Sequence, residues 1–357
     1  MKCKLEDIVD VTMGQSPKSE YYNTEGKGYP FLQGNRTFGF KYPTFDTYTT
    51  VMTKPAKAGD VIMSVRAPVG DLNITPVDMC LGRGVCSLRM KNENQDFLFY
   101  MMKYYIPHLL KKESGTVFGS VNRNDINGLE VNIPEDAQVQ KKIARYLEMI
   151  DDKIELNNAI NNNLEQQAQA IFDSMFPNIS NGENTIGDTI TPKRGKGLLS
   201  KNAVFGNVPV VAGGLEPSTY HNTANTKAPV LAISASGANA GFVSLWNIPI
   251  WSSDSSFIDS SMTDDVYFWY VLLKKRQREI YDSQTGSAQP HIYPQHIAAM
   301  PISDLNFDDV RNYTSIVTPF FEMIGHNKDE NARLATTRDT LLPKLMSGEL
   351  DVSDIEI

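Results

Sequence analysis

The feature that most constrains this chain is a pattern of side-chain types that it contains twice. The matching residues lie 171 positions apart with no gap between them: Val121 and Ile292, Ile126 and Ile297, Leu129 and Met300, Val131 and Ile302. A repeat of this length has to be recognised first, because it determines the architecture of the whole chain.

Three further pairs of stretches occur in the same order at a similar spacing. They are "LEDIVDVTMGQSPKS" (5–19) with "IGDTITPKRGKGLLS" (186–200), "GDVIMSVRAPVG" (59–70) with "PVLAISASGANAG" (229–241), and "LEMIDDKIELNNAI" (147–160) with "FEMIGHNKDENARL" (321–334). The chain is therefore predicted to be two copies of a unit of roughly 170 to 180 residues.

Each copy begins with a part rich in Gly, Pro, Ser, Thr and aromatic residues, over 1–133 and 181–305. Short β-type runs such as "DVIMSV" and "PVLAISA" are separated there by turn signals, which predicts a mostly β module. Two stretches with an aromatic face, 96–112 and 265–281, are the predicted helices of the modules.

Each copy ends in a predicted long helix. No glycine occurs between Pro134 and Phe176, and apolar residues recur there at helical steps, with Pro134 suited to the first turn. The second helix is predicted from about Asp308 to Met346, with a kink at Pro319 and disturbed last turns at Pro343. The apolar stripes of the two helices contain the predicted packing residues Ile143, Leu147, Ile150, Ile154, Leu164, Phe172, Phe320, Phe321, Ile324, Leu334, Leu341 and Leu345.

A long amphipathic helix needs a partner for its apolar stripe. The simplest solution is an antiparallel pair, which holds the two modules apart about a pseudo-twofold axis. The alternative is that each helix only covers its own module. The predicted fold class is α+β, with two β-rich modules separated by a coiled-coil-like pair of long antiparallel helices.

The sequence lacks the common signatures of catalysis. It has no phosphate-binding loop, no Asn- or Asp-Pro-Pro-aromatic methyltransferase motif and no CxxC pair among its three cysteines. The "DDK" at 151–153 resembles the end of a nuclease motif, but its place within a predicted helix favours a solvated helix face. We therefore expect no catalytic residues and no metal site. The absence of a long apolar run and of a leader predicts a cytoplasmic protein.

Basic and amide side chains gather in the turns of both modules, although the net charge of the chain is −8. Arg and Lys bind guanine or phosphate, and Asn and Gln bind adenine, so these turns predict a surface that reads DNA. The predicted contact residues are Gln33, Asn35, Arg36, Arg66, Arg83, Asn122 and Arg123 in the first module, and Lys193, Arg194, Lys196, Ser236, Asn239, Gln289 and His291 in the second.

The chain resembles a specificity subunit of a type I restriction–modification system. The resemblance covers nearly the whole chain and is carried by "GDVIMSVRAPVG", by "SGTVFGSVNRNDINGLEVNIP" running into "QVQKKIARYLEMIDDKIELNN", and by "RDTLLPKLMSGELDV". It implies two target-recognition domains and two conserved spacer helices. Their expected bounds are 1–134 and 179–306 for the recognition domains, 135–178 for the first spacer helix, and 307–357 for the second spacer helix with the C-terminal tail.

The resemblance also implies partners. They are double-stranded DNA, two modification subunits that use S-adenosylmethionine to methylate adenine, and two restriction subunits that use ATP and Mg. This chain itself is then expected to hold no cofactor, and helices of the modification subunits are expected to complete a bundle around the spacer helices. Because "SASGANAG" has no arginine where the first copy has Arg66, the two modules should read different half-sites.

Two other classes of protein remain open at this point. One is a solitary β-rich binding protein with a helical stalk, for carbohydrate or another ligand, which would need no partner subunit. The other is a standalone nuclease or methyltransferase fragment, against which the missing motifs count.

Overall fold

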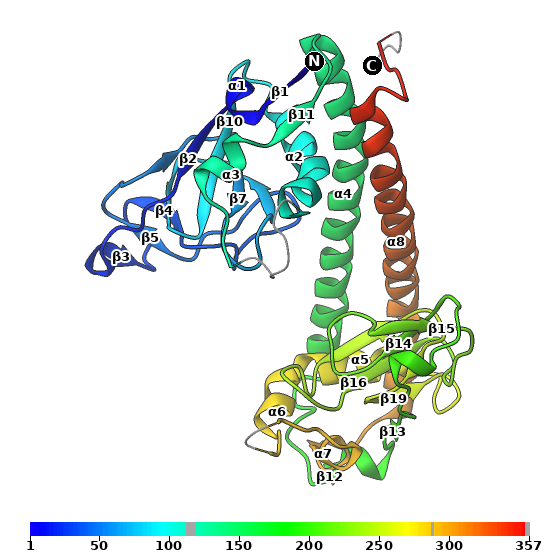
Figure 1. The fold of residues 1–357 in the computed structure, drawn as a ribbon. Coiled ribbons are helices and arrows are strands. Elements are labelled where there is room, and N and C mark those ends of the chain that lie inside the picture. The colour runs from blue at the N-terminus through cyan, green and yellow to red at the C-terminus, as the bar shows by residue number, and fades with distance from the viewer. Residues whose placement is uncertain (112–118, 287–288, 354–357) are drawn as a thin grey trace. The chain divides into compact units, whose positions relative to one another are not determined.

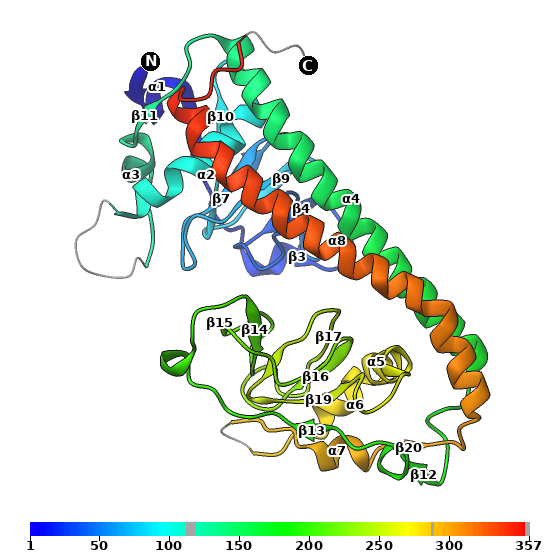
Figure 2. The same cartoon turned by 90° about the vertical axis from the view of Figure 1, so that its right-hand side faces the viewer.

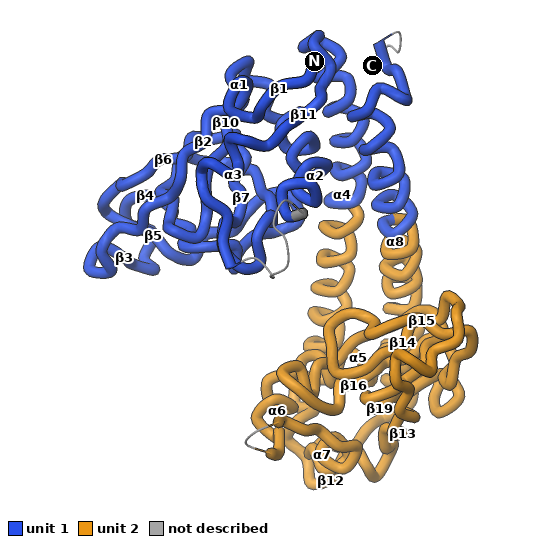
Figure 3. The backbone as a smooth tube through the Cα atoms, viewed as in Figure 1, with its two compact units in different colours: residues 1–156, 331–357 blue, residues 157–330 orange. Residues whose placement is uncertain are grey.

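The computed structural model describes residues 1–111, 119–286 and 289–353. The chain forms two compact units (Figure 3). Unit 1 contains residues 1–156 together with 331–357, and unit 2 contains residues 157–330. Unit 1 is therefore built from both ends of the chain, whereas unit 2 is one continuous segment.

Unit 1 contains two main sheets (Figure 1). Buried aliphatic and aromatic residues form its core. An antiparallel sheet has the order β2 (Val9–Met13), β10 (Val85–Met90), β7 (Val61–Ser64), β8 (Leu72–Ile74). A second sheet has the order β3 (Tyr22–Asn23), β5 (Tyr48–Thr49), β4 (Tyr29–Leu32), β9 (Met79–Leu81), β6 (Pro55–Ala56), and β1 (Lys2–Lys4) pairs with β11 (Glu130–Asn132). The helices of this module are α1 (Leu5–Ile8), α2 (Gln95–Lys111) and α3 (Arg123–Asn127).

Unit 2 repeats this plan with fewer strands in its second sheet. Its antiparallel sheet has the order β13 (Lys193–Arg194), β19 (Ser255–Asp259), β16 (Val230–Ser234), β17 (Val243–Trp246). A second sheet has the order β15 (Thr219–His221), β14 (Val208–Val211), β18 (Trp251–Ser252), and β12 (Asn184–Thr185) pairs with β20 (Pro301–Ile302). The predicted helix at 265–281 is divided at Arg276 into α5 (Val266–Lys275) and α6 (Gln277–Asp282), and α7 (Pro294–Ala298) follows.

The repeat is visible in equivalent backbone hydrogen bonds. The turn after β7 closes where the N–H of Gly70 donates to the carbonyl of Ser64 at 3.0 Å. The turn after β16 closes in the same way, from Gly241 to Ser234 at 2.7 Å. Both glycines have positive φ, +97° and +91°, a conformation that residues with a Cβ rarely adopt. The matched stretches at 59–70 and 229–241 therefore fold alike.

The first long helix, α4 (Ala137–Met175), begins three residues after Pro134. The side chain of Asp136 accepts a hydrogen bond from the N–H of Gln138 at 2.8 Å, which caps the first turn. The prediction that Pro134 lies in that turn was wrong. Pro134 precedes the helix, and its carbonyl accepts from the Gln140 side chain at 2.8 Å.

The second long helix, α8 (Phe307–Ser347), continues without interruption through both of its prolines. The prediction that Pro343 disturbs the last turns was therefore wrong, and the kink at Pro319 stays a prediction. Both prolines lie on the exposed face, and the neighbouring Val317 and Leu342 are buried against the rest of their units. Each proline removes one backbone hydrogen bond, and the packing on the opposite face keeps the helix intact.

The two long helices pack side by side and run antiparallel (Figures 1 and 2). In unit 1, Arg338 of α8 binds Asp151 of α4. In unit 2, the amide of Asn327 donates to Asn161 at 2.8 Å, and the hydroxyl of Tyr313 donates to the carbonyl of Ala168 at 3.0 Å. Residue numbers rise along α4 as they fall along α8, which confirms the predicted antiparallel pair.

The residues predicted to pack along the two helices are all at least partly buried. Those that are buried are Ile143, Leu147, Ile154, Phe172, Phe321, Ile324 and Leu345. Those that are half-buried are Ile150, Leu164, Phe320, Leu334 and Leu341.

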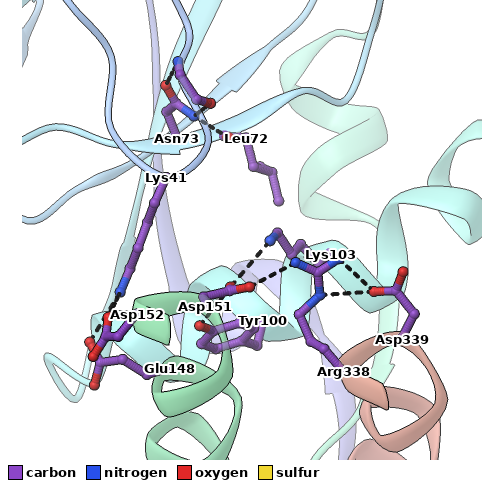
Figure 4. A network of polar contacts seen from close by, with 11 residues as sticks. Lys41, Leu72, Asn73, Tyr100, Lys103, Glu148, Asp151, Asp152, Arg338 and Asp339 are labelled. Atoms are coloured by element: carbon purple, nitrogen blue, oxygen red, sulfur yellow. Dashed lines mark hydrogen bonds and ion pairs between the residues drawn. The ribbon is translucent and has the colours of Figure 1, made fainter. Parts of the chain in front are cut away.

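A buried polar network joins α2, α4 and α8 (Figure 4). The carboxylate of Asp151 is completely buried and accepts a hydrogen bond from the hydroxyl of Tyr100 at 2.9 Å. It also binds the guanidinium of Arg338 at 2.7 Å and lies 3.6 Å from the Nζ of Lys103. Burial lowers the pKa of Lys103, and the charge of Asp151 opposes that change. The prediction that residues 151–153 form a solvated helix face was therefore wrong at Asp151.

A second polar contact fastens the loop after β4 to α4. The Nζ of Lys41 is 3.1 Å from Glu148 and 3.8 Å from Asp152, and its side chain is almost fully buried (Figure 4). Burial alone would lower the pKa of Lys41, but the hydrogen bond and charge of Glu148 raise it above its ordinary value. Lys41 therefore stays charged and holds this loop against the helix.

Candidate nucleic-acid interface

In unit 1, three loops at one edge of the sheets are tied together by their backbones. Gln33 follows β4, Arg66 lies just beyond β7, and Arg83 lies in the turn between β9 and β10. The N–H of Gly84 donates to the carbonyl of Gln33 at 2.9 Å, and the N–H of Val65 donates to the carbonyl of Gly84 at 2.9 Å. The structure thus brings together three predicted contact residues that are far apart in the sequence.

The side chains at this edge are of two kinds. Arg66 and Arg83 are exposed, and neither has an ion-pair partner within the described residues. The guanidinium of Arg36, in contrast, binds Asp46 at 2.8 Å, and this hydrogen bond lowers the pKa of that carboxyl. Arg66 and Arg83 are therefore free to bind bases or phosphates, while Arg36 would have to leave Asp46 or bind with its remaining donors.

The other predicted residues of this module have structural contacts of their own. Asn35 donates to Asp71, and Arg123 donates to the carbonyl of Val11. The side chain of Asn122 accepts from two backbone N–H groups and caps the start of α3. These contacts fix the loops, and they limit what the same atoms can offer to a ligand.

A cavity of about 990 Å³ lies beside this edge of unit 1. Three predicted contact residues line it, Gln33, Arg36 and Arg83, and the segment from Gln15 to Glu20 forms another part of its wall. The lining combines these polar side chains with apolar ones such as Phe31 and Leu32, and the polar side chains suit a hydrogen-bonding ligand such as a nucleic acid.

In unit 2, two of the predicted residues bind Asp254. Its carboxylate binds the guanidinium of Arg194 at 2.6 Å and accepts a hydrogen bond from the hydroxyl of Ser236. Ser236 forms a β-bridge with His291, whose ring stacks on Tyr293 with centroids 5.9 Å apart. Of the remaining predicted residues, Asn239 is half-buried, and those that are exposed are Lys193, Lys196 and Gln289.

The two edges occupy equivalent places in the repeat. In unit 1, Val65 donates its N–H to the carbonyl of Gly84 and accepts from the N–H of Val121, both at 2.9 Å. In unit 2, Ala235 makes the same two bonds, to Asp254 at 3.0 Å and from Ile292 at 2.9 Å. The residues that follow, Arg66 and Ser236, are therefore structural counterparts, as the alignment of the two stretches predicted.

We call the equivalent backbone hydrogen bonds of Val65 and Ala235 the hydrogen-bonded frame. The two edges carry different charges on this frame, which the sequence did not reveal. Asp254 stands where unit 1 has Gly84, so the second edge contains a carboxylate that neutralises Arg194. Asp46 and Asp71 similarly hold Arg36 and Asn35. Sequence reasoning missed these three acids because each lies 10 to 60 positions from its partner and belongs to no motif.

The described residues offer neither a metal site nor a membrane span. They contain no cluster of three or more His, Cys, Asp or Glu placed to hold a metal ion. In the same residues, none of the helices combines the length and the apolar character that crossing a bilayer requires.

Comparison with known proteins agrees with this duplicated architecture. Residues 1–166 match the family model of the type I restriction modification DNA specificity domain. A putative type I restriction enzyme MjaX specificity subunit from Methanocaldococcus jannaschii is 38% identical over 173 residues, which is 48% of this chain and 40% of that protein. The type I restriction enzyme MjaIX specificity subunit from the same organism is 23% identical over 99% of this chain and 94% of its own length.

A solved structure shows the same fold over the whole length. It is the crystal structure of a type I restriction–modification system S subunit from M. genitalium, with a TM-score of 0.61 and 19% identity over 97% of this chain and 96% of that one. Two β-rich units that share a pair of long helices, with a polar edge in each, define a class of duplicated α+β proteins. Residues 1–166 therefore match a type I restriction modification DNA specificity domain, and the chain as a whole is similar to type I restriction–modification specificity subunits.

Proposed function

We propose that this chain recognises an asymmetric, bipartite DNA sequence, with one half-site read by each unit. One observation carries the proposal. Arg66 and Ser236 occupy the same position in the same hydrogen-bonded frame, so the two units present different chemistry from equivalent places. An exposed arginine reads guanine or holds phosphate, whereas a serine bound to a carboxylate offers a shorter and less basic contact.

The proposed contact residues are those predicted from the sequence. Arg66 and Arg83 are the strongest of them, because they are exposed and have no ion pair among the described residues. The proposed recognition domains are residues 1–134 and 179–306, with the spacer helices between and after them. The long helices are the proposed docking platform for partner subunits.

The proposed assembly is the one that the similarity to type I specificity subunits implies. Two modification subunits would bind S-adenosylmethionine and methylate adenine within the target, and two restriction subunits would use ATP and Mg. This chain would contribute recognition and no catalytic group. The exposed apolar residues Met149 and Leu156 on α4 support a partner on that helix, because they are 52% and 55% exposed within the chain.

The test is co-expression of the chain with the modification subunit of its host, followed by mapping of methylated adenines in plasmid DNA. We expect methylation at one split, asymmetric motif. The double variant Arg66→Ala with Arg83→Ala should lose specificity in one half of the motif and keep it in the other. Arg278→Ala is the matched control, since Arg278 is an exposed arginine held by Asp282 on α6.

Three outcomes would contradict the proposal. If the two proteins do not associate, the helix pair is not a docking platform and a solitary binding protein becomes the better description. If they associate but methylate no defined motif, the chain does not read DNA. If the double variant changes both halves equally, the edge of unit 1 does not belong to one half-site.

A further inference from the structure

A segment of unit 2 combines positive charge with exposed apolar side chains. Between Asp188 and Glu216 the chain has four basic residues and no acidic one, although its net charge is −8. The basic residues are Lys193, Arg194, Lys196 and Lys201. A segment with this excess of positive charge favours an anionic partner over a neutral or basic one.

The apolar side chains of this segment point into solvent. Phe205 is 96% exposed, more than any other large hydrophobic residue in the described part of the chain, and Leu199 and Val204 are 62% and 54% exposed. Single exposed apolar residues are common on protein surfaces. Here three of them lie within seven positions, with Lys201 between them and Lys193 and Lys196 shortly before, while Arg194 is paired with Asp254. We call Leu199, Val204 and Phe205 the Phe205 patch.

The backbone holds the Phe205 patch in place. The N–H of Val204 donates to the Nδ1 of His221 at 3.0 Å, and the His221 ring packs edge-on against Trp251 at 5.0 Å. On the other side of Phe205, a Cβ on Gly206 would come within 2.4 Å of the backbone of Asn222, so only glycine allows this close approach. The loop therefore presents Phe205 from a packed base.

The repeat indicates which face the Phe205 patch belongs to. The 3₁₀ turn Ser200–Asn202 that precedes Phe205 lies 181 positions after the 3₁₀ turn Ser19–Tyr21 of unit 1, the same spacing as between the matched stretches at 5–19 and 186–200. In unit 1 the cavity beside that turn is lined by Arg83 and other predicted contact residues. In unit 2 a cavity of about 590 Å³ beside the equivalent turn is lined by Phe205 itself.

We propose that Phe205, supported by Leu199 and Val204, is an apolar wedge that inserts between base pairs of the half-site read by unit 2. The neighbouring lysines would hold the phosphates on either side. Proteins that insert a phenylalanine in this way partly unstack one base step and kink the duplex, and the bent DNA covers more of the protein surface, which offsets the unstacking. This inference rests on the proposed function. It adds that unit 2 recognises its half-site partly by how easily the DNA kinks at one base step.

The test uses the assembly of the full chain with the host modification subunit, bound to a duplex that carries the mapped motif. 2-Aminopurine, whose fluorescence rises on unstacking, is placed at each step of the second half-site in turn. Wild-type protein should raise the fluorescence at one step. Phe205→Ala should abolish that rise and weaken binding about 10- to 100-fold, the effect of losing one buried aromatic contact. Phe205→Trp should preserve both.

The control is Ile248→Ala, which removes another exposed apolar side chain of unit 2 and should change neither readout. The inference is overturned if Phe205→Ala binds the motif as wild type does, or if no step unstacks in the wild-type complex. It is also overturned if Phe205→Ala prevents co-purification with the modification subunit, because the patch would then be a subunit interface. A wild-type assembly that methylates one defined motif upholds the proposed function in each of these cases.

Discussion

Asp151 is a carboxylate without access to solvent, and its three partners come from two other helices. Tyr100 and Lys103 belong to α2, and Arg338 belongs to α8. A buried charge of this kind adds little net stability over an apolar core, but removal of one member leaves the others without compensation. The network therefore selects one arrangement of the three helices, because any shift of one helix along another would leave a buried charge without its partner.

We expect Asp151→Asn to destabilise unit 1 by about 3 kcal/mol, since the partly buried Lys103 would lose its counter-charge and Arg338 would keep only the exposed Asp339. Tryptophan fluorescence separates the units, because all three tryptophans, at 246, 251 and 269, lie in unit 2. Urea unfolding followed by circular dichroism should show an earlier transition, while the tryptophan signal keeps its midpoint. Asp152→Asn is the control, as Asp152 is half exposed and should shift neither signal.

At the scale of the element, α8 shows how packing overrides a local rule. A proline inside a helix costs about 3 kcal/mol relative to alanine, yet α8 contains two and remains continuous. Pro343 lies between the buried Leu342 and Leu345, which pack into the core of unit 1. The apolar face of the last turns thus keeps the helix formed despite the missing backbone hydrogen bond.

Pro343→Ala should therefore stabilise unit 1 by about 1 to 3 kcal/mol, because it restores a backbone donor without changing the buried face. The measurement is the urea midpoint from circular dichroism, with the tryptophan signal of unit 2 as an internal reference. A lowered midpoint would mean that the proline ring itself makes a needed contact.

The elements could be predicted from the sequence better than the polar contacts. The repeat, the two long helices and their antiparallel pairing follow from periodicity, because burial of an apolar stripe is a property of one segment. The burial of Asp151 and the pairing of Arg194 with Asp254 could not be predicted in this way. Each depends on a residue 51 to 187 positions away, and polar residues carry no periodic signal of their partners.

At the scale of the whole molecule, the two units are variations on one hydrogen-bonded frame. They differ in what they place on it, with free arginines at the edge of unit 1 and Asp254 with the Phe205 patch in unit 2. A shared frame with different edge chemistry means that the modules are exchangeable in principle.

Replacement of residues 181–305 by a second copy of residues 1–133 should convert the asymmetric target into a symmetric one. Because the helices are antiparallel, the two identical half-sites should be inverted relative to each other. Mapping of methylated adenines with the co-expressed modification subunit checks this. Retention of the original asymmetric motif would show that residues outside the modules determine the sequence read.

Unit 1 is completed by the last residues of the chain, while unit 2 is one continuous stretch. During synthesis, unit 2 can therefore fold as soon as Glu330 has left the ribosome, whereas unit 1 waits for Arg338, Leu342 and Leu345 to reach its core. A stop codon or frameshift at about residue 331 would leave unit 2 complete and would remove the part of α8 that completes unit 1. A truncation near the end of the chain would thus destabilise the unit that contains the first residues of the chain.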